Sequence, residues 1–218
     1  MKNTIAILLL ILMLTLFGAH AEEIISPEAD FYYYDEVGIL SEETKGEIFY
    51  SNKLLYDDCG AQIVVAIINS TGKYSSEEYS IKLFNKWGIG DSEKNNGFLL
   101  LLAIQDDDYY ACPGEGLEPL LPAATIKEMF DLYLEDDFAA KRYEDGAKKF
   151  FEEVFKYIAE IYHSDVTIQD GIHAYNSLYG KTTADAIDLS GMSWDELMTI
   201  QQRIVEEMQQ RTESGNKP

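Results

Sequence analysis

The chain has 218 residues and is strongly acidic, with 39 Asp and Glu residues against 17 Lys and Arg residues and a formal net charge of −22 at pH 7. Such a field repels nucleic-acid phosphates and anionic lipid headgroups, so direct binding to nucleic acid or to a membrane surface is not expected. The charge instead favours cations or basic partners, or it serves solubility alone.

The first 21 residues have the organisation of a secretory signal peptide. Lys2 precedes a run over residues 5–17 that is apolar except for Thr15, and residues 18–21 have the small-x-small form that signal peptidase requires. The run is roughly 20 Å long as a helix, which is shorter than the ~30 Å hydrocarbon core of a bilayer. We expect cleavage after Ala21 and a secreted or extracytoplasmic mature chain, with an uncleaved anchor as the alternative. No later stretch is apolar and long enough for direct membrane insertion after cleavage.

Residues 30–162 carry the alternating pattern of one α/β domain. The predicted strands are short apolar runs, and the predicted helices show apolar residues at helical spacing between capping and glycine signals. In chain order, we expect a helix whose apolar stripe covers residues 42–56 and which ends near Gly60, a strand at 61–68, a helix from Ser75 or Ser76 to Trp87, strands at 97–104 and 108–113, a helix whose main body opens at Pro122, and a helix at 139–162. The short turn at residues 105–107 makes the last two strands a hairpin, and the two fully apolar strands need cover on both faces. These features predict a three-layer α/β/α sandwich with a small mixed sheet.

Residues 163–218 have a different texture and are predicted to form an acidic C-terminal extension. Residues 165–189 are polar and without period, which predicts irregular structure. Ser193 and Glu196 form a capping box before an apolar face at helical period, so we expect one amphipathic helix of about twenty residues there. That face either folds back on the domain or binds another protein. Residues 212–218 are predicted to be a disordered end.

Five short motifs follow one another through residues 30–162. They read YDEVGILS at residues 34–41, QIVV at 62–65, WGIG at 87–90, NNGFLL at 95–100 and GEGLE at 114–118. In this order and spacing, they resemble the TPM domain family of exported bacterial and thylakoid-lumen proteins. The resemblance implies an α/β/α sandwich behind a signal peptide, divalent-cation binding in some members, and an acid phosphatase activity.

Two departures from the family pattern bear on function. Relatives often carry an Asp a few residues after the Gly-Leu-Glu segment, whereas residues 121–124 of this chain read LPAA. If that Asp takes part in metal binding or hydrolysis, this chain has lost a ligand. Many relatives also continue into a membrane helix or a low-complexity tail, where this chain has its acidic extension.

Oxygen-bearing side chains are expected to gather at one rim of the predicted sheet. The hairpin sets the start of its first strand beside the end of its second, which brings Asn96 close to Glu115. Together with Asp35 and Glu118, these residues are hard oxygen donors of the kind that Ca²⁺ collects in flexible loops. The sequence therefore predicts a Ca²⁺ site formed by Asp35, Asn96, Glu115 and Glu118, with a merely solvated acidic rim as the alternative.

Two cysteines remain after signal cleavage, Cys59 and Cys112, and exported proteins favour disulfides. If the predicted strands run as expected, both thiols lie at the same end of the sheet. A disulfide would then stabilise the fold by roughly 3 to 4 kcal/mol in the chain-entropy model. Two separately buried free thiols are the alternative.

Signals for phosphoester hydrolysis are weak by comparison. Both histidines of the mature chain, His163 and His173, lie at or beyond the end of the domain, too late for a histidine nucleophile. The Asp-rich segment at residues 106–108 has the chemistry of a turn. Tyrosines at residues 32–34 and 109–110 suit either a contact surface or strand packing.

We therefore expect an exported module that binds a divalent cation, Ca²⁺, as its only cofactor and that acts by contact with an envelope or extracellular protein. The alternative is a metal-assisted acid phosphatase that acts on phosphomonoesters at the same rim. A plainer third hypothesis is an adaptor whose C-terminal helix contacts a client protein. The sequence leaves the oligomeric state open.

Overall fold

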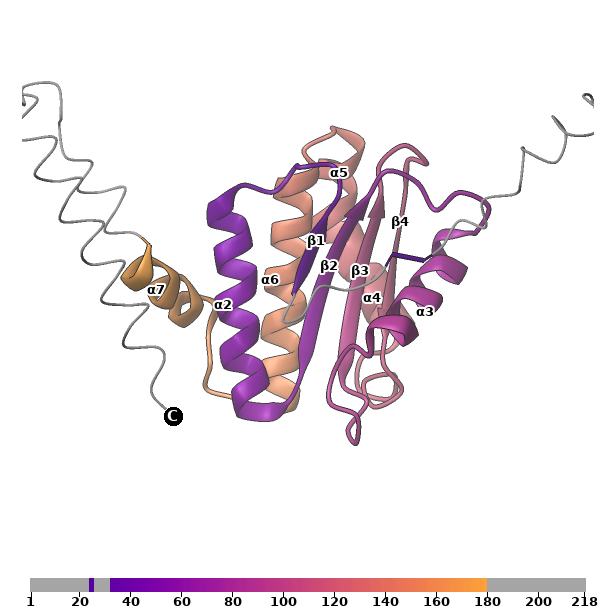
Figure 1. Ribbon diagram of the computed structural model, residues 1–218. Helices are drawn as coiled ribbons and strands as arrows, with labels where there is room; N and C mark the ends of the chain where they lie inside the picture. Colours follow the sequence, from indigo (N-terminus) through magenta and orange to yellow (C-terminus); the bar gives the residue numbers. More distant parts are fainter. Residues whose placement is uncertain (1–23, 26–31, 180–218) are drawn as a thin grey trace, which may run out of the picture. The chain divides into compact units, whose positions relative to one another are not determined.

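The computed structural model describes residues 24–25 and 32–179 of the chain (Figure 1). The predicted signal peptide at residues 1–21, the amphipathic helix expected after Ser193 and the predicted disordered end all lie outside these residues. The chain divides into two compact units, Met1–Tyr175 and Asn176–Pro218, and the architecture that follows is that of the first unit. Among the described residues, no helix has both the length and the apolar character that a membrane span requires.

Four strands form one mixed sheet in the order β1-β2-β3-β4 (Figure 1). The strands are β1 (Tyr33–Asp35), β2 (Gln62–Ile68), β3 (Gly97–Ala103) and β4 (Asp108–Pro113). The first three run parallel, and β4 returns antiparallel to β3 through the predicted hairpin. Both β1 and β4 are therefore edge strands of this sheet.

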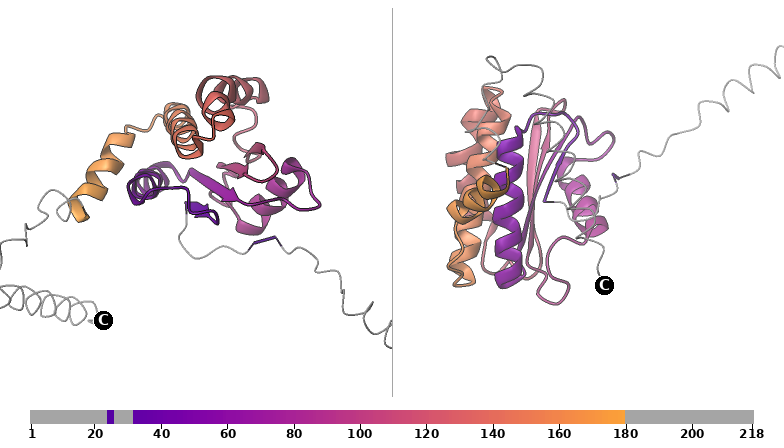
Figure 2. Two further views of the ribbon diagram at one scale, coloured as in Figure 1. Left: turned by 90° about the horizontal axis from the view of Figure 1, so that it is seen from above. Right: turned by 60° about the vertical axis from the view of Figure 1, so that its left-hand side comes forward.

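Helices cover both faces of the sheet, and the predicted α/β/α sandwich is confirmed (Figures 1 and 2). α2 (Glu42–Cys59), α4 (Ala123–Met129) and α6 (Tyr143–Ile161) contribute to one apolar cluster, and α3 (Ser76–Trp87) contributes to the other. Because successive side chains of a strand point to opposite faces, β2 supplies both clusters in alternation. After Gln62 the strand is apolar throughout for that reason.

The two parallel crossovers lie on opposite faces of the sheet. α2 connects β1 to β2 on one face, whereas α3 connects β2 to β3 on the other. Two crossovers that advance in the same direction on opposite faces have opposite hands, so one of them departs from the usual right-handed rule. On its face of the sheet, α3 packs against β3 and β4.

The helix boundaries follow local capping chemistry where the sequence carried a clear signal. Ser41 caps α2 by accepting a hydrogen bond from the Thr44 amide, and the left-handed Gly60 ends the helix. Ser75 and Glu78 form a complete capping box at the start of α3. These boundaries were predicted: the apolar stripe of α2 covers residues 42–56, and the helix was expected to end near Gly60, as it does.

Three expectations about elements were wrong. α4 continues into a π-helical turn (Phe130–Leu134) and α5 (Glu135–Ala139), and a reversal at the left-handed Lys141 delays α6 until Tyr143 rather than residue 139. β1 was not predicted because it is only three residues long. An irregular segment was expected after residue 165, but α7 (Ile168–Leu178) forms there.

Candidate functional site

The loops that carry the glycine-rich motifs meet at the end of the sheet where β2 and β3 begin. We call the loops at residues 88–96 and 114–118 the amino-end rim. The Gly114 amide donates to the Gly97 carbonyl at 2.8 Å, and the Gly116 amide donates to the Asn95 carbonyl at 3.0 Å. A Cβ atom added at Gly114 or Gly116 would collide with the backbone of the facing loop. The glycines therefore allow two backbones to pack directly against each other.

Asn96 joins the loops of this rim from the inside. Its side chain is fully buried, its Oδ1 accepts from the Asp91 amide at 3.1 Å, and its Nδ2 donates to the Cys59 carbonyl at 3.4 Å. Lys94 reaches the same carbonyl of Cys59 with its Nζ at 2.7 Å. The carboxamide of Asn96 is thus engaged in holding the loops together.

Glu115 and Glu118 lie on the outside of the rim, and both are exposed. The Gly114 carbonyl accepts from the amides of Leu117 and Glu118, at 2.8 and 3.1 Å, so the loop turns helically between the two carboxylates. Leu117 is fully buried beneath it. This turn fixes Glu115 and Glu118 as solvent-facing groups at one corner of the domain.

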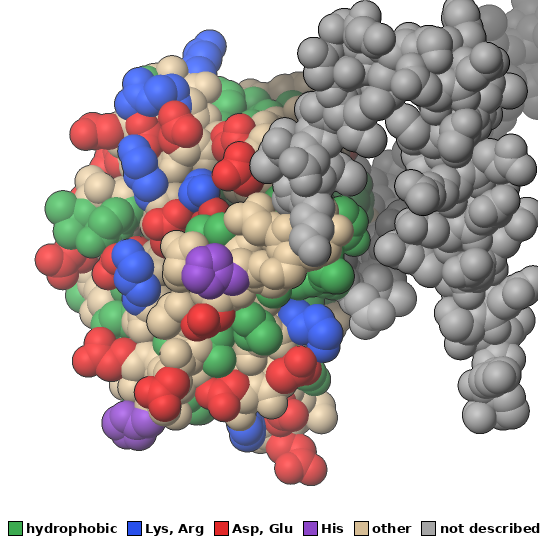
Figure 3. Space-filling model, turned by 90° about the vertical axis from the view of Figure 1, so that its left-hand side faces the viewer, with side chains coloured by type: hydrophobic (Ala, Val, Ile, Leu, Met, Phe, Trp, Pro, Cys, Tyr) green, Lys and Arg blue, Asp and Glu red, His purple; other side chains and the backbone are tan. Residues whose placement is uncertain are grey.

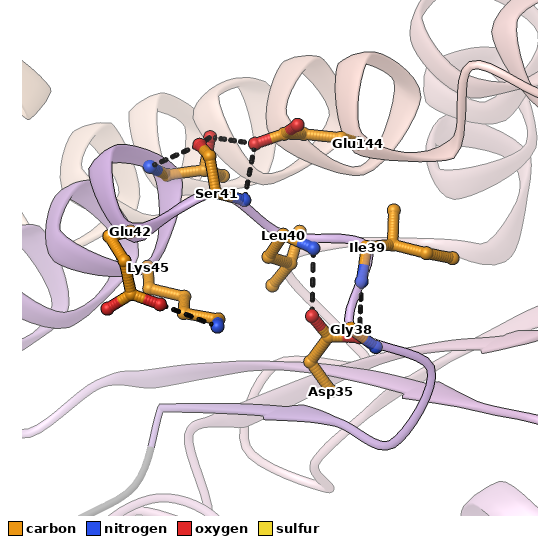
Figure 4. A network of polar contacts seen from close by, with 9 residues as sticks. Asp35, Gly38, Ile39, Leu40, Ser41, Glu42, Lys45 and Glu144 are labelled. Atoms are coloured by element: carbon orange, nitrogen blue, oxygen red, sulfur yellow. Dashed lines mark hydrogen bonds and ion pairs between the residues drawn. The ribbon is translucent and has the colours of Figure 1, made fainter.

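Asp35 lies at the opposite end of the sheet. Its carboxylate accepts hydrogen bonds from the amides of Gly38, Ile39 and Leu40, at 2.9, 3.1 and 2.8 Å (Figure 4). Gly38 has φ +73°, a left-handed conformation that glycine adopts without strain. The Asp-x-x-Gly-x-Leu pattern is thereby explained as a carboxylate-capped turn that leads into α2.

The four predicted Ca²⁺ ligands do not converge. Asp35 pairs with Ile67 near the end of β2, whereas Gly97, the neighbour of Asn96, pairs with Gln62 at its beginning. Five strand residues separate these positions, which is roughly 17 Å. The prediction went wrong because it did not include β1 and so placed Asp35 at the wrong end of the sheet. The expected adjacency of the 95–96 and 114–115 loops, in contrast, is present.

What remains at the rim does not fit Ca²⁺ as a dedicated site. Glu115 and Glu118 offer two exposed carboxylates, whereas Ca²⁺ takes about six to eight oxygen ligands. Within residues 24–25 and 32–179, no three His, Cys, Asp or Glu side chains gather in a group that would hold a metal ion.

The opposite end of the sheet holds a second polar network, which the sequence presented as a simple turn. Asp106 accepts from the Ser70 hydroxyl at 2.7 Å and from the Thr71 amide at 2.7 Å. Burial opposes ionisation of Asp106, but these hydrogen bonds outweigh it and hold the pKa of the carboxyl below its ordinary 3.8. Asp106 thus ties the hairpin to the loop before α3, as a structural residue.

The predicted disulfide between Cys59 and Cys112 is not formed. Cys59 belongs to the apolar cluster on the α2 face, whereas Cys112 packs against the cluster on the α3 face. The two thiols thus lie on opposite faces of the sheet. The order of the strands in the sequence indicates the end of the sheet at which each cysteine lies, but not the face. Burial raises the pKa of Cys112 to about 11 and also raises that of Cys59, so both are poor nucleophiles at neutral pH.

Two hollows open on the surface of this unit. One, of about 410 Å³, lies between β4 and α4 and is bordered by Glu118 and Lys127. The other, of about 630 Å³, lies between α6 and residues 164–172. On the face that carries α7, acidic and basic side chains are interspersed with hydrophobic ones (Figure 3), so charge selects no ligand there. The hollow beside β4 adjoins the amino-end rim through Glu118.

Comparisons with known proteins agree with the motif pattern. A family model described as the TPM domain matches residues 33–157. No curated protein sequence matches significantly. Among solved structures, the fold is similar to the N-terminal domain of a protein from P. gingivalis, with a TM-score of 0.56 and 22% identity over 62% of this chain and 86% of that one. At this identity the likeness concerns the fold alone.

Two further solved structures are more distant. A protein from the psychrophilic bacterium Bizionia argentinensis has a TM-score of 0.47 and 13% identity, over 59% of this chain and 92% of that one. The N-terminal domain of a Corynebacterium glutamicum protein has a TM-score of 0.45 and 13% identity, over 62% and 86%.

Proposed function

The chain belongs to the TPM domain family, and from that premise we propose that it is an exported binding module that acts by contact with an envelope or extracellular protein. We assign the contact to the amino-end rim and the hollow beside β4. One observation carries this proposal: the exposed Glu118 borders an apolar hollow of about 410 Å³ whose lining includes the buried Leu121 and Ile126. Apolar area rimmed by charge suits protein recognition.

The roles of the motif residues support binding over chemistry. Asp35, Asn96 and Gly114 carry the family resemblance, and each is used in the hydrogen bonding or close packing of the fold. The exposed groups at the rim include the carboxylates of Glu115 and Glu118, which lie on a hydrogen-bonded turn. Such groups attract a basic surface and fix its orientation.

A metal-assisted acid phosphatase is the second reading of the same rim. It would depend on Glu115 and Glu118 to hold a cation, since the two carboxylates alone repel a phosphate. Turnover of p-nitrophenyl phosphate that disappears in Glu115→Gln would support this reading. Turnover that persists in that variant would place the activity elsewhere.

Site-specific photo-cross-linking tests the binding proposal. A photoactivatable amino acid replaces Glu118 at the rim or, as a matched control, Glu42, whose side chain is 83% exposed beside the opposite end of the sheet. We expect exposure to native envelope proteins to give a discrete cross-linked partner from position 118, with at least several-fold less from position 42. Equal labelling from both positions would contradict a contact at the rim.

A further inference from the structure

β4 is the last strand of the sheet, so one side of its backbone is not paired with another described strand, although Ala111 as a whole is only 7% exposed. The Gly114 amide bonds to the Gly97 carbonyl, and Cys112 pairs with Leu99. Because hydrogen-bonded pairs alternate along an antiparallel ladder, even-numbered residues of β4 face β3. The backbone groups of Tyr109, Ala111 and Pro113 therefore point away from the sheet.

This outer edge presents mostly hydrogen-bond acceptors. The Tyr109 amide already donates to the Asp108 carboxylate at 2.9 Å, and Pro113 has no amide hydrogen. Ala111 keeps both its N–H and its C=O. The edge thus offers three carbonyls and one amide; the Pro113 carbonyl accepts only a long contact from the Cys112 thiol, at 3.9 Å. Among the described residues, the Ala111 amide donates to no backbone carbonyl outside the sheet.

These features make a second copy of the chain a poor partner for the outer edge of β4. Antiparallel self-pairing centred on Ala111 would set Tyr109 opposite Pro113, where neither residue has a free amide to donate. Only the two bonds at Ala111 would form. The exposed Asp108 would also approach the glutamates of the rim on the other copy, and like charges in that arrangement are unfavourable.

A basic extended segment has the complementary properties. Exposed carboxylates lie at both ends of β4, with Asp107 and Asp108 at one end and Glu115 and Glu118 at the other. Lys127 is the cation that borders the hollow, and it is paired with Asp131 at 2.7 Å. Positive side chains on an added strand would therefore meet an acidic surround.

The hollow supplies a place for apolar side chains of such a strand. It is lined by Ala111 and Pro113 from β4 and by Ile126 and Phe130 from the adjoining helical segment. A residue that pairs directly with Ala111 points its side chain to the same face, which is the face of α4 and the hollow. Alternate residues of the added strand would then be apolar.

From this geometry we propose that β4 receives an extended, basic segment of a partner protein as an antiparallel fifth strand, with alternate apolar side chains seated in the hollow. The inference rests on the proposed binding function and names the chemistry of its partner. In this arrangement the segment donates three amide hydrogens to Tyr109, Ala111 and Pro113 and accepts one from Ala111. Backbone bonds provide affinity, and the hollow and the carboxylates provide selectivity.

A synthetic peptide of alternating Val and Lys residues is the probe, because its register predicts which amides donate. In the antiparallel orientation, the Val side chains face the hollow, and the Val residues pair directly with Tyr109, Ala111 and Pro113. The N–H groups of the Val residues therefore donate the hydrogen bonds to β4. With the isotopically labelled chain lacking only the predicted signal peptide, we expect NMR shifts at Tyr109 and Ala111 and slower exchange of the Ala111 amide.

Two N-methylated peptides provide the decisive comparison without altering the protein. Methylation of the Val amides should weaken binding by about tenfold or more, because each methyl group removes a donor and blocks the edge. Methylation of the Lys amides should leave binding within about threefold. Equal affinity of both peptides, or shifts confined to other surfaces, would overturn strand addition. Cross-linking at position 118 would still report separately on the proposed function.

Discussion

The side chains of Asp35 and Asn96 are both hydrogen-bonded to partners inside the protein. Asp35 accepts from three successive amides, and buried Asn96 connects Asp91 to Cys59. A cation would compete with these hydrogen bonds for the same oxygen atoms, and a buried polar group left unpaired costs about 1–3 kcal/mol. We therefore assign both residues to the stability of the fold.

Asp35→Asn tests that assignment. Asparagine offers one acceptor oxygen in place of two, so at least one of the three amides loses its partner. We expect the free energy of unfolding to fall by about 1–3 kcal/mol. Because the role is structural, the loss should be the same with added Ca²⁺ and with chelator, as measured by urea denaturation.

Asp57→Asn is the matched control for this substitution. Asp57 is exposed and makes a surface ion pair with Lys53 at 3.0 Å, which is worth about 0–1 kcal/mol. Its replacement should change stability little in either condition. A loss in Asp35→Asn that appears only when Ca²⁺ is present would restore Asp35 as a ligand.

Individual residues whose partners lie close by in the sequence could be assigned correctly from the sequence. Ser41 and Ser75 were recognisable as caps because the partner amide lies three residues ahead. The partners of Asn96 are a loop five residues back and a carbonyl 37 residues away, so its role depends on how three loops assemble. Residue type alone therefore suggested a ligand where the fold required a connector.

α7 packs directly on α2 through a glycine. A Cβ atom at Gly171 would overlap the backbone and hydroxyl of Ser51, and the Ser51 hydroxyl lies 3.5 Å from the Ile168 carbonyl. Thr167 and Asp170 form a reciprocal capping pair that starts the helix. This pair was the signal for α7 that our sequence analysis missed.

Gly171→Ala should therefore destabilise the protein, although alanine normally favours a helix by about 1 kcal/mol over glycine. We expect the unfolding free energy to fall by about 1–3 kcal/mol, because Ser51 backbone atoms cannot move aside cheaply. Chemical denaturation provides the measurement. Asn176→Ala, on the exposed side of the same helix, should have little effect, and a stabilised Gly171→Ala variant would refute the packing argument.

A buried glutamate connects α2 to α6. Glu47 is 2% exposed, its Oε2 lies 2.6 Å from the Lys148 Nζ, and its Oε1 has no hydrogen-bond partner within the described residues. Burial raises the pKa of Glu47 above its ordinary 4.5 despite the attraction of Lys148, and the neighbouring Glu152 adds to the rise. The ionised carboxylate is thus disfavoured in the folded state.

The direction of the pH effect follows from that shift. A folded-state pKa above the unfolded value means that the folded protein binds the proton first as pH falls. The penalty of ionised Glu47 is fully present above the raised pKa and is relieved as pH falls toward 4.5. Relative to Glu47→Gln, which stays neutral, the wild-type protein should therefore gain stability between neutral pH and about pH 5.

Denaturation of both proteins across this pH range measures the difference. Glu42→Gln, at an exposed position of the same helix, corrects for the general loss of one negative charge. A wild-type advantage that stays constant with pH would show that Glu47 keeps an ordinary pKa.

At the level of elements, the sequence predicted β2, β3, β4 and the extent of α3 because each is bounded by strong turn signals. The three-residue β1 is too short for a period to emerge. That omission moved Asp35 to the wrong end of the sheet. The start of α6 was also missed, since the left-handed Lys141 gives no sign in a run of helix-forming residues.

For the molecule as a whole, the net charge of −22 links stability to recognition. Excess negative charge disfavours the compact state through self-repulsion, yet it attracts a basic partner. Salt screens both effects over a Debye length of about 10 Å at 0.1 M. Added salt should therefore raise the stability of the folded chain and lower its affinity for a basic partner. A general effect of salt on the protein would not be expected to change these two quantities in opposite directions.

Raising NaCl from about 20 mM to about 200 mM should therefore raise the thermal midpoint by a few degrees, about 1 kcal/mol of stability. The same change should weaken binding of the Val-Lys peptide by about threefold to tenfold, because the carboxylates beside β4 are exposed and fully screened. In Glu115→Gln/Glu118→Gln, the salt dependence of binding should shrink while that of the thermal midpoint stays nearly unchanged, since two charges are a small part of the total. A salt dependence of binding that is unchanged in the double variant would mean that the rim carboxylates do not act as a local attractor for the peptide.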